Sequence, residues 1–213
     1  AALLSTELNR VDSAVEAFAK ALGCDPRNLT ALDGLIDITR ERERFGELAA
    51  LLERRAELSP ALESAGQRFE LAQIYARQLD RKDAAIEQLK IAKAHDPSST
   101  HVLRLLGDLY VEADRLDLAL TQYQDLRVLY EADGYDEPVP AFLMTIATVY
   151  DGLGRFSDSS ELIRAAIDRD PERIQTYARG QELVLNGGQL SDVLALLRYG
   201  LERAGQPKAR TYL

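Results

Sequence analysis

The sequence has few thiol and imidazole side chains, which often serve as nucleophiles, bases or metal ligands: one cysteine and two histidines in 213 residues. A single cysteine excludes an internal disulfide, which fits a reducing compartment, and we expect Cys24 to be packed at a helix end rather than reactive. The histidines, His95 and His101, flank Pro97 and have Asp96 as the one obvious further ligand. A solvent-facing turn explains this segment better than a metal site, and we expect no cofactor.

Long hydrophobic runs and basic runs are also missing. No apolar stretch approaches the roughly 18 residues of a transmembrane helix, so we expect no membrane insertion. The start, AALLSTELNR, has neither the basic flank nor the apolar segment of a signal peptide. It also lacks Met, which favours a fragment or processed form, and we expect a cytoplasmic location unless a targeting signal has been lost. A net charge of −9 opposes nucleic acid as a partner, because phosphates are bound by positive charge.

Motifs with catalytic spacing are missing too. The sequence contains no G-x-x-x-x-G-K loop, no G-x-S-x-G and no C-x-x-C pair. The acidic segment EADGYDEP, residues 131–138, has the composition of a calcium site, but its carboxylates lack the alternating spacing of a calcium-binding loop. A solvated linker is the better interpretation, and we expect the chain not to be an enzyme.

What the sequence does have is a long internal period, marked by prolines. Five prolines each follow a stretch of helical pattern: Pro26, Pro60, Pro97, Pro171 and Pro207. Their separations are 34, 37, 74 and 36 residues, so the third gap is a double step in which one proline is missing. Apolar residues spaced three and four apart precede them, as at Ala85, Leu89 and Ala92, which predicts a helix before each turn.

A second helical pattern lies upstream in each period and combines a small with a large residue. Examples are Leu71, Ala72 and Tyr75; Leu106, Gly107 and Tyr110; and Ile146, Ala147 and Tyr150. We expect Gly107 to let a neighbouring helix approach closely and Tyr123 to fill a gap, so that enlarging Gly107 to Leu costs roughly 1–3 kcal/mol. Neither helix of a pair can bury its apolar stripe alone, and the pairs must therefore stack.

These residues resemble the tetratricopeptide repeat, whose 34-residue pattern has a large residue, then L-G-x-x-Y, then A-x-x-x-F-x-x-A and a closing proline. LLGDLYVEADRLDLALTQY, residues 105–123, matches it, as does IATVYDGLGRFSDSSELIRAAIDRDP, residues 146–171. The resemblance covers essentially the whole chain. It implies an all-α fold, a right-handed superhelix or α-solenoid of about six antiparallel helix pairs, over residues 1–22, 28–58, 62–95, 99–132, 138–169 and 173–203.

The corresponding prediction for domains is one solenoid, residues 1–213. Its repeats are 1–28 (truncated), 29–61, 62–98, 99–137, 138–172 and 173–207, followed by a tail, 208–213. The sequence departs from the pattern in four places. The first unit keeps only a remnant of its first helix over 1–8, and the second has Leu35, Ile36 and Thr39 where Leu, Gly and Tyr are expected. The third has about one extra residue, and an insertion occupies 131–140.

In the family, the first helix of each pair lines a concave groove, and the resemblance carries groove positions over to this chain. The predicted peptide- or partner-binding residues are Asp33, Arg40, Phe69, Gln73, Arg77, Arg104, Asp108 and Met144, with Tyr135 added as an exposed aromatic of the insertion. Arg40, Arg77 and Arg104 would form a ladder for backbone carbonyls or carboxylates of an extended peptide. The alternative is that the arginines pair with neighbouring acids, Asp37, Asp108 and Glu112, on an ordinary wet surface.

Three functions fit this pattern. The first is a protein–protein interaction scaffold or adaptor that holds a peptide or partner protein in the groove. The second is a regulatory or substrate-recruiting arm of a larger enzyme or signalling protein. The third is self-assembly into a homo-oligomer through terminal repeats, using residues 1–8 or an apolar stripe at Val193, Leu194, Leu197 and Leu201. All three are binding functions, with protein or peptide as the partner.

Overall fold

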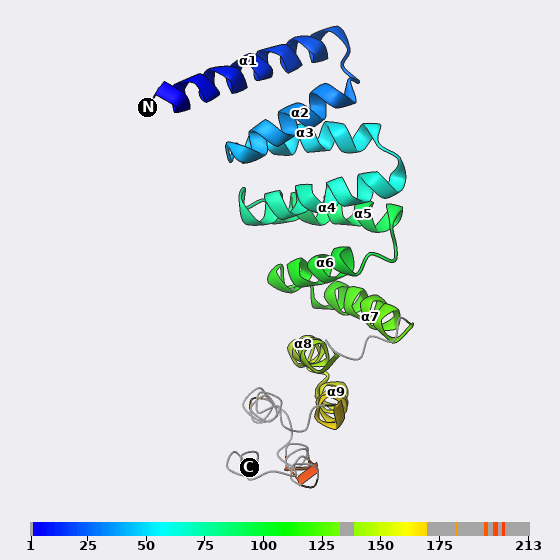
Figure 1. Cartoon of the computed structure of the whole chain (residues 1–213). Coiled ribbons are helices and arrows are strands. Elements are labelled where there is room, and N and C mark those ends of the chain that lie inside the picture. Colours follow the sequence, from blue (N-terminus) through cyan, green and yellow to red (C-terminus); the bar gives the residue numbers. More distant parts are fainter. Residues whose placement is uncertain are drawn as a thin grey trace. The chain divides into compact units, whose positions relative to one another are not determined.

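Helices account for all the regular structure that the computed structural model describes, which comprises residues 2–132 and 139–169 and the isolated residues 182, 194, 195, 198, 199 and 202. Nine helices are delimited in this part of the chain (Figure 1). They are α1 (Ala2–Cys24), α2 (Leu29–Glu41), α3 (Phe45–Leu58), α4 (Ala61–Arg77), α5 (Lys82–His95), α6 (Thr100–Glu112), α7 (Leu116–Ala132), α8 (Val139–Gly152) and α9 (Phe156–Arg169). The predicted all-α helical-repeat fold is confirmed.

The chain divides into two compact units, Ala1–Leu106 and Gly107–Leu213, with the boundary inside α6. Within the first unit, each helix from α1 to α4 packs on the one that follows it in sequence. Within the second unit, α7 packs on α8, and α8 packs on α9. From α2 to α9 the helix ends lie within one residue of the predicted pairs. The predicted sixth pair, the tail and most of the insertion lie outside the described residues, so the division into six repeats stays a prediction.

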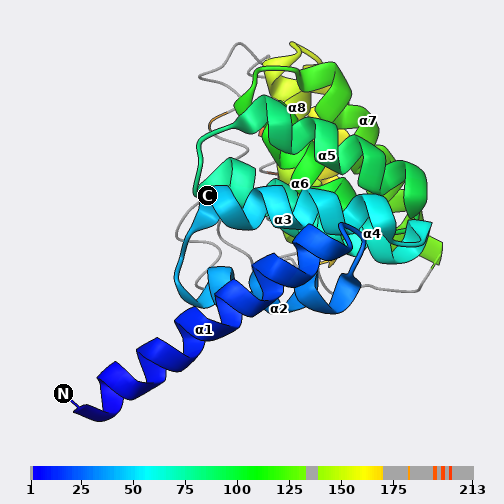
Figure 2. The same ribbon diagram turned by 90° about the horizontal axis from the view of Figure 1, so that it is seen from above.

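The first helix differs from the prediction of a remnant over residues 1–8 followed by a second helix. Instead, α1 is one continuous helix of 23 residues, Ala2–Cys24. No glycine or proline occurs before Gly23, so nothing in the segment stops a helix once it has begun. In Figure 2 the first turns of α1 extend past α2.

Cys24 corrects a second expectation. We expected a packed side chain, but this free cysteine is exposed. It is the last residue of α1, beyond the apolar stripe that faces α2, and the chain turns away at Asp25 and Pro26.

The turns inside the helix pairs share one backbone conformation. One residue in each has a positive φ: Glu43 (54°), Asp80 (50°), Asp114 (56°) and Gly154 (70°). A left-handed residue just after a helix lets a later N–H bond back to the last turn's carbonyls and so ends the helix. The short breaks predicted from the sequence therefore have a common geometry, although only one of the four residues is glycine.

The extra residue of the third unit lies in such a turn. The N–H of Arg115 bonds to the carbonyl of Tyr110 at 2.8 Å, five residues back, and Arg155 bonds to Tyr150 in the same way at 2.8 Å. In the third unit the N–H of Arg81 bonds to the carbonyl of Tyr75 at 2.7 Å, six residues back. The turn between α4 and α5 absorbs the added residue, and the helices on either side keep their apolar registers.

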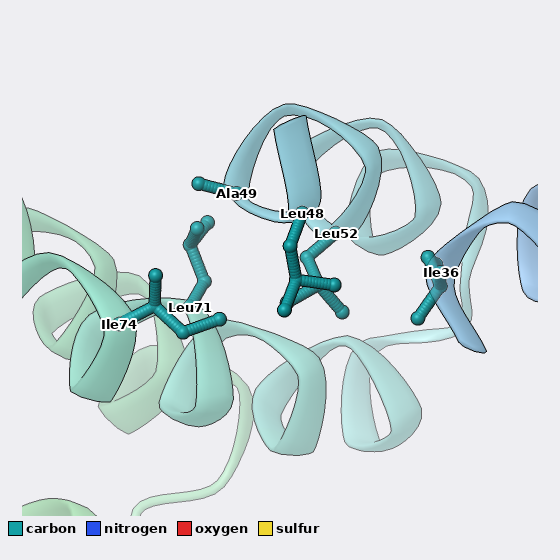
Figure 3. Packing of buried hydrophobic residues seen from close by; sticks show 6 residues of the cluster. All are labelled: Ile36, Leu48, Ala49, Leu52, Leu71 and Ile74. Atoms are coloured by element: carbon teal, nitrogen blue, oxygen red, sulfur yellow. The ribbon is translucent and has the colours of Figure 1, made fainter. Parts of the chain in front are cut away.

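The core of the first unit shows how the stripes are buried (Figure 3). Six side chains from α2, α3 and α4, none more than 7% exposed, form one cluster: Ile36, Leu48, Ala49, Leu52, Leu71 and Ile74. Leu48 and Leu52 are one helical turn apart and place α3 against both α2 and α4. Because burying a leucine contributes about 1.5–3 kcal/mol, this sharing of α3 stabilises the stack more than either helix pair could by itself.

One position of this repeating core carries a polar side chain. Ala85 and Ala119 occupy equivalent small positions at 0% exposure, and Ser159 occupies the next one, also at 0%. Among the described residues the Ser159 hydroxyl has no hydrogen-bond partner. A buried hydroxyl without a partner is destabilising relative to a methyl group.

Replacing Ser159 by alanine is therefore expected to raise the free energy of unfolding by about 1 kcal/mol, through the removed hydroxyl and the better helix propensity. Urea denaturation followed by circular dichroism measures this change. Ser157→Ala, at an exposed position of the same helix, serves as the control and is expected to shift stability by less than about 0.5 kcal/mol. A destabilised Ser159→Ala protein would mean that the hydroxyl has a stabilising partner.

None of the helices in the described part of the chain is both long and apolar enough to cross a membrane.

Candidate functional site

The face of α2 and α4 is held together by an arginine. Arg40 on α2 donates from Nε and Nη2 to Oε1 of Glu70 on α4, at 3.1 and 2.9 Å, and from Nη1 to Oδ1 of Asp37 at 2.8 Å. These bonds, the one to Glu70 above all, raise the pKa of Arg40 above its usual value. The first helices of successive pairs, α2 and α4, are thus bridged by a side chain. Arg40 also forms the ion pair with Asp37 that is expected if the arginines of this face pair with neighbouring acids.

A second arginine reaches this face from α3. Arg55 donates from Nε to Oδ1 of Asp33 at 2.7 Å, from Nη2 to Oε1 of Glu63 at 2.8 Å, and from Nη1 to the hydroxyl of Ser59. Its side chain is only 11% exposed. The hydrogen bond to Asp33 outweighs burial and raises the pKa of Arg55, so the guanidinium stays charged. Arg55 therefore links α2, α3 and α4.

A cavity of about 180 Å³ opens between these three helices. Its lining consists of Asp33, Ile36, Asp37, Arg40, Leu52, Arg55, Gln67 and Glu70. Ile36 and Leu52 belong to the buried cluster of Figure 3 and give the cavity an apolar part, while charged groups surround the rest. The cavity can hold a side chain that is apolar along its length and polar at its tip.

An aromatic contact continues this face toward α6. The rings of Phe69 on α4 and His101 on α6 lie 6.2 Å apart at an interplanar angle of 41°. Phe69 is half-buried and His101 is exposed. His101 thus contacts a neighbouring helix as well as solvent, and within the described residues no group of three or more His, Cys, Asp or Glu side chains could hold a metal.

The structure brings together only some of the predicted binding residues. Asp33 and Arg40 line the cavity, and Phe69 lies one residue before Glu70 on α4. Gln73 and Arg104 are half-buried on α4 and α6. Arg77 is exposed at the end of α4.

The remaining predicted residues lie in the second unit or outside the described residues. Asp108 accepts a hydrogen bond from the hydroxyl of Tyr123 at 2.5 Å, so its carboxylate also fixes a core ring. Met144 is half-buried on α8. Tyr135 falls outside the described residues. Leu194 is 45% exposed, and its three companions in the predicted terminal stripe are outside them as well.

Four residues at or beside the cavity were missed by the sequence analysis: Arg55, Glu63, Gln67 and Glu70. Arg55 was overlooked because it lies on the second helix of its pair, whereas the resemblance carried over only first-helix positions. Glu70 precedes the signature Leu71 directly, and its separation of 30 residues from Arg40, close to one repeat length, was the available signal.

Part of the chain matches the model of a known protein family. Residues 69–136 match the model of the tetratricopeptide repeat family, and this segment contains the Gly107 and Tyr123 signature. This segment belongs to the tetratricopeptide repeat family. No curated protein matches the sequence of the chain.

Solved structures with the same fold match over most of the chain. One is YrrB, described as a tetratricopeptide repeat protein with an unusual peptide-binding site, with a TM-score of 0.61 at 14% identity over 93% of this chain and 97% of YrrB. MamA has a TM-score of 0.57 at 20% identity over 80% of this chain and 88% of its own. BtubC from P. vanneervenii has a TM-score of 0.58 at 14% identity, over 94% and 90%. At these identities the likeness shows the fold of stacked tetratricopeptide repeats.

Proposed function

We propose that this protein is a non-catalytic scaffold that binds an extended segment of a partner protein on the α2–α4–α6 face. The observation that carries the proposal is the 180 Å³ cavity on this face, which combines buried apolar residues with charged ones. Binding sites of this kind place a few polar groups around an apolar floor.

Three further facts support a binding role. The catalytic motifs sought in the sequence are missing, and the chain's own charged groups on this face are already ordered by one another, which reduces the entropic cost of binding. YrrB, which has the same fold, is described as having a peptide-binding site. We infer that protein or peptide, rather than a small metabolite, is the ligand class.

Reversing charge on this face is expected to abolish partner capture. The test is a pull-down from native lysate with the chain and with a variant in which Arg40, Arg77 and Arg104 are changed to Glu. Glutamate at position 40 would face Asp37 and Glu70 and break the Arg40 bridge between α2 and α4, so a partner that needs the geometry of this face is expected to bind at least about tenfold more weakly. The matched control changes three exposed arginines of the turns, Arg27, Arg81 and Arg115, to Glu.

Loss of the partner with the face variant alone supports the proposal. Equal capture by all three proteins would contradict it, because the partner would then bind elsewhere. Circular dichroism of each variant checks that helix content is unchanged, so that loss of binding is not loss of fold.

A further inference from the structure

We propose that the cavity between α2, α3 and α4 accepts a lysine or arginine side chain, so that the partner segment is basic. This inference rests on the proposed function and adds the chemical class of the segment to it. It differs from the sequence-based expectation, in which the arginines of this face would bind carboxylates.

The first step is the charge of the cavity. Three carboxylates and two guanidinium groups line it, leaving a net charge of −1. Glu63, which pairs with Arg55, adds another negative charge beside the lining. Arg40, which was predicted to bind a ligand, is shared between Glu70 and Asp37, and Arg55, which was not predicted, is shared between Asp33 and Glu63. The positive charge is therefore already neutralised within the protein.

The second step is the open hydrogen-bonding capacity. An ionised carboxylate accepts about four hydrogen bonds in all. Asp33, Asp37 and Glu70 each accept through a single oxygen among the described residues. Their second oxygens are left for a ligand, and their side chains are 52%, 72% and 36% exposed. The Arg55 side chain is only 11% exposed, so few of its N–H groups can donate to a ligand. Acceptors outnumber donors, which favours an incoming cation.

The third step is shape. Ile36 and Leu52 are 5% and 2% exposed and form the apolar part of the cavity. The aliphatic stems of lysine and arginine cover apolar surface while their charged ends stay at a polar rim. An acidic side chain here would meet like charges. A purely apolar one would remove water from the carboxylates without replacing its hydrogen bonds.

The direct test uses amino-acid probes on the full chain. N-acetyl-lysine-N-methylamide, its norleucine analogue and its glutamate analogue are titrated while the side-chain Nε–H signals of Arg40 and Arg55 are followed by NMR. We expect saturable shifts with the lysine probe, in the millimolar range usual for so small a ligand, and at least about tenfold weaker effects with the other two. Equal shifts with norleucine, or stronger ones with glutamate, would overturn the inference.

A second test uses a random peptide library selected on the immobilised chain. Enrichment of lysine or arginine is expected among the peptides selected on the chain. Asp37→Lys, at an exposed position, is expected to weaken these peptides about tenfold. Glu57→Lys, also exposed but on α3 and outside the cavity lining, is the matched control and is expected to have little effect.

The two proposals fail differently. Face-dependent peptides without basic enrichment would overturn the basic-segment inference and leave the scaffold function standing. Selected peptides that bind Asp37→Lys as well as the unaltered chain would overturn the scaffold function on this face, and the lysine probe would still decide whether the cavity prefers a cation.

Discussion

Gly107→Leu is expected to lower the free energy of unfolding by about 3 kcal/mol, at the upper end of what overpacking of a core usually costs. A Cβ atom placed on Gly107 would lie 2.5 Å from Cε1 of Tyr123 and 2.8 Å from its Cδ1. The aromatic ring packs directly on the glycine backbone, so even one added carbon requires the ring to move.

The ring has little freedom to move, which is why the expected cost is large. Its hydroxyl donates to Asp108 at 2.5 Å, and the edge of Phe142 meets it at a centroid distance of 5.7 Å and an angle of 89°. Tyr123 is 1% exposed and Phe142 is 2% exposed. Moving the ring breaks the hydrogen bond or displaces Phe142 within a close-packed core.

Urea denaturation of Gly107→Leu measures the effect, with Gly66→Leu as the matched control. Gly66 also lies within a helix, α4, but is exposed, and a Cβ there would meet nothing within 4 Å. Because leucine has the better helix propensity, the control is expected to gain up to about 1 kcal/mol. Adding Tyr123→Leu to Gly107→Leu is expected to recover part of the loss. Equal stability of the two single variants would disprove the close contact.

Arg55→Met is expected to cost about 2 kcal/mol of stability, the usual range for hydrogen bonds that involve charged groups. Methionine keeps much of the length and apolar packing of the side chain but removes its bonds to Asp33, Glu63 and Ser59. The cost stays below that of a fully buried pair, because the two carboxylates are about half exposed and can be rehydrated.

Denaturation of Arg55→Met at low and high salt measures this contribution. The control is Arg44→Met: that arginine is 56% exposed and pairs with Glu47 at 3.4 Å, so its loss is expected to cost less than about 0.5 kcal/mol. Salt is expected to change the Arg55 effect little, because the guanidinium is mostly buried. Wild-type stability in Arg55→Met would mean that the charged network does not hold α2, α3 and α4 together.

Local pattern predicted the parts of this structure that depend on neighbours in sequence. Apolar spacing located α2 to α9, since a helix with an apolar stripe needs only residues three and four apart to define it. The small residue Gly107 predicted a close approach by a neighbouring helix, and the structure shows that Tyr123 is the side chain that packs there. The extra residue of the third unit was visible as a shift in period.

Other features could not be derived from local pattern. Cys24 was expected to be packed because it follows an apolar stripe. The residue lies just beyond that stripe, however, and its side chain is exposed to solvent. Glu43, Asp80 and Asp114 adopt the left-handed backbone conformation although none of them is glycine, so their residue type did not predict it. The surrounding helix packing imposes this conformation.

The sequence by itself predicted an all-α fold of stacked helix pairs, because neither helix of a pair can bury its apolar stripe alone. Only the tertiary structure decided the character of the binding face. Arg55 comes from a second helix, and Glu70 meets Arg40 across 30 residues, so their pairing depends on how α2, α3 and α4 stack. That stacking makes Arg40, which the resemblance assigned to a ligand, a partner of the protein's own Asp37 and Glu70.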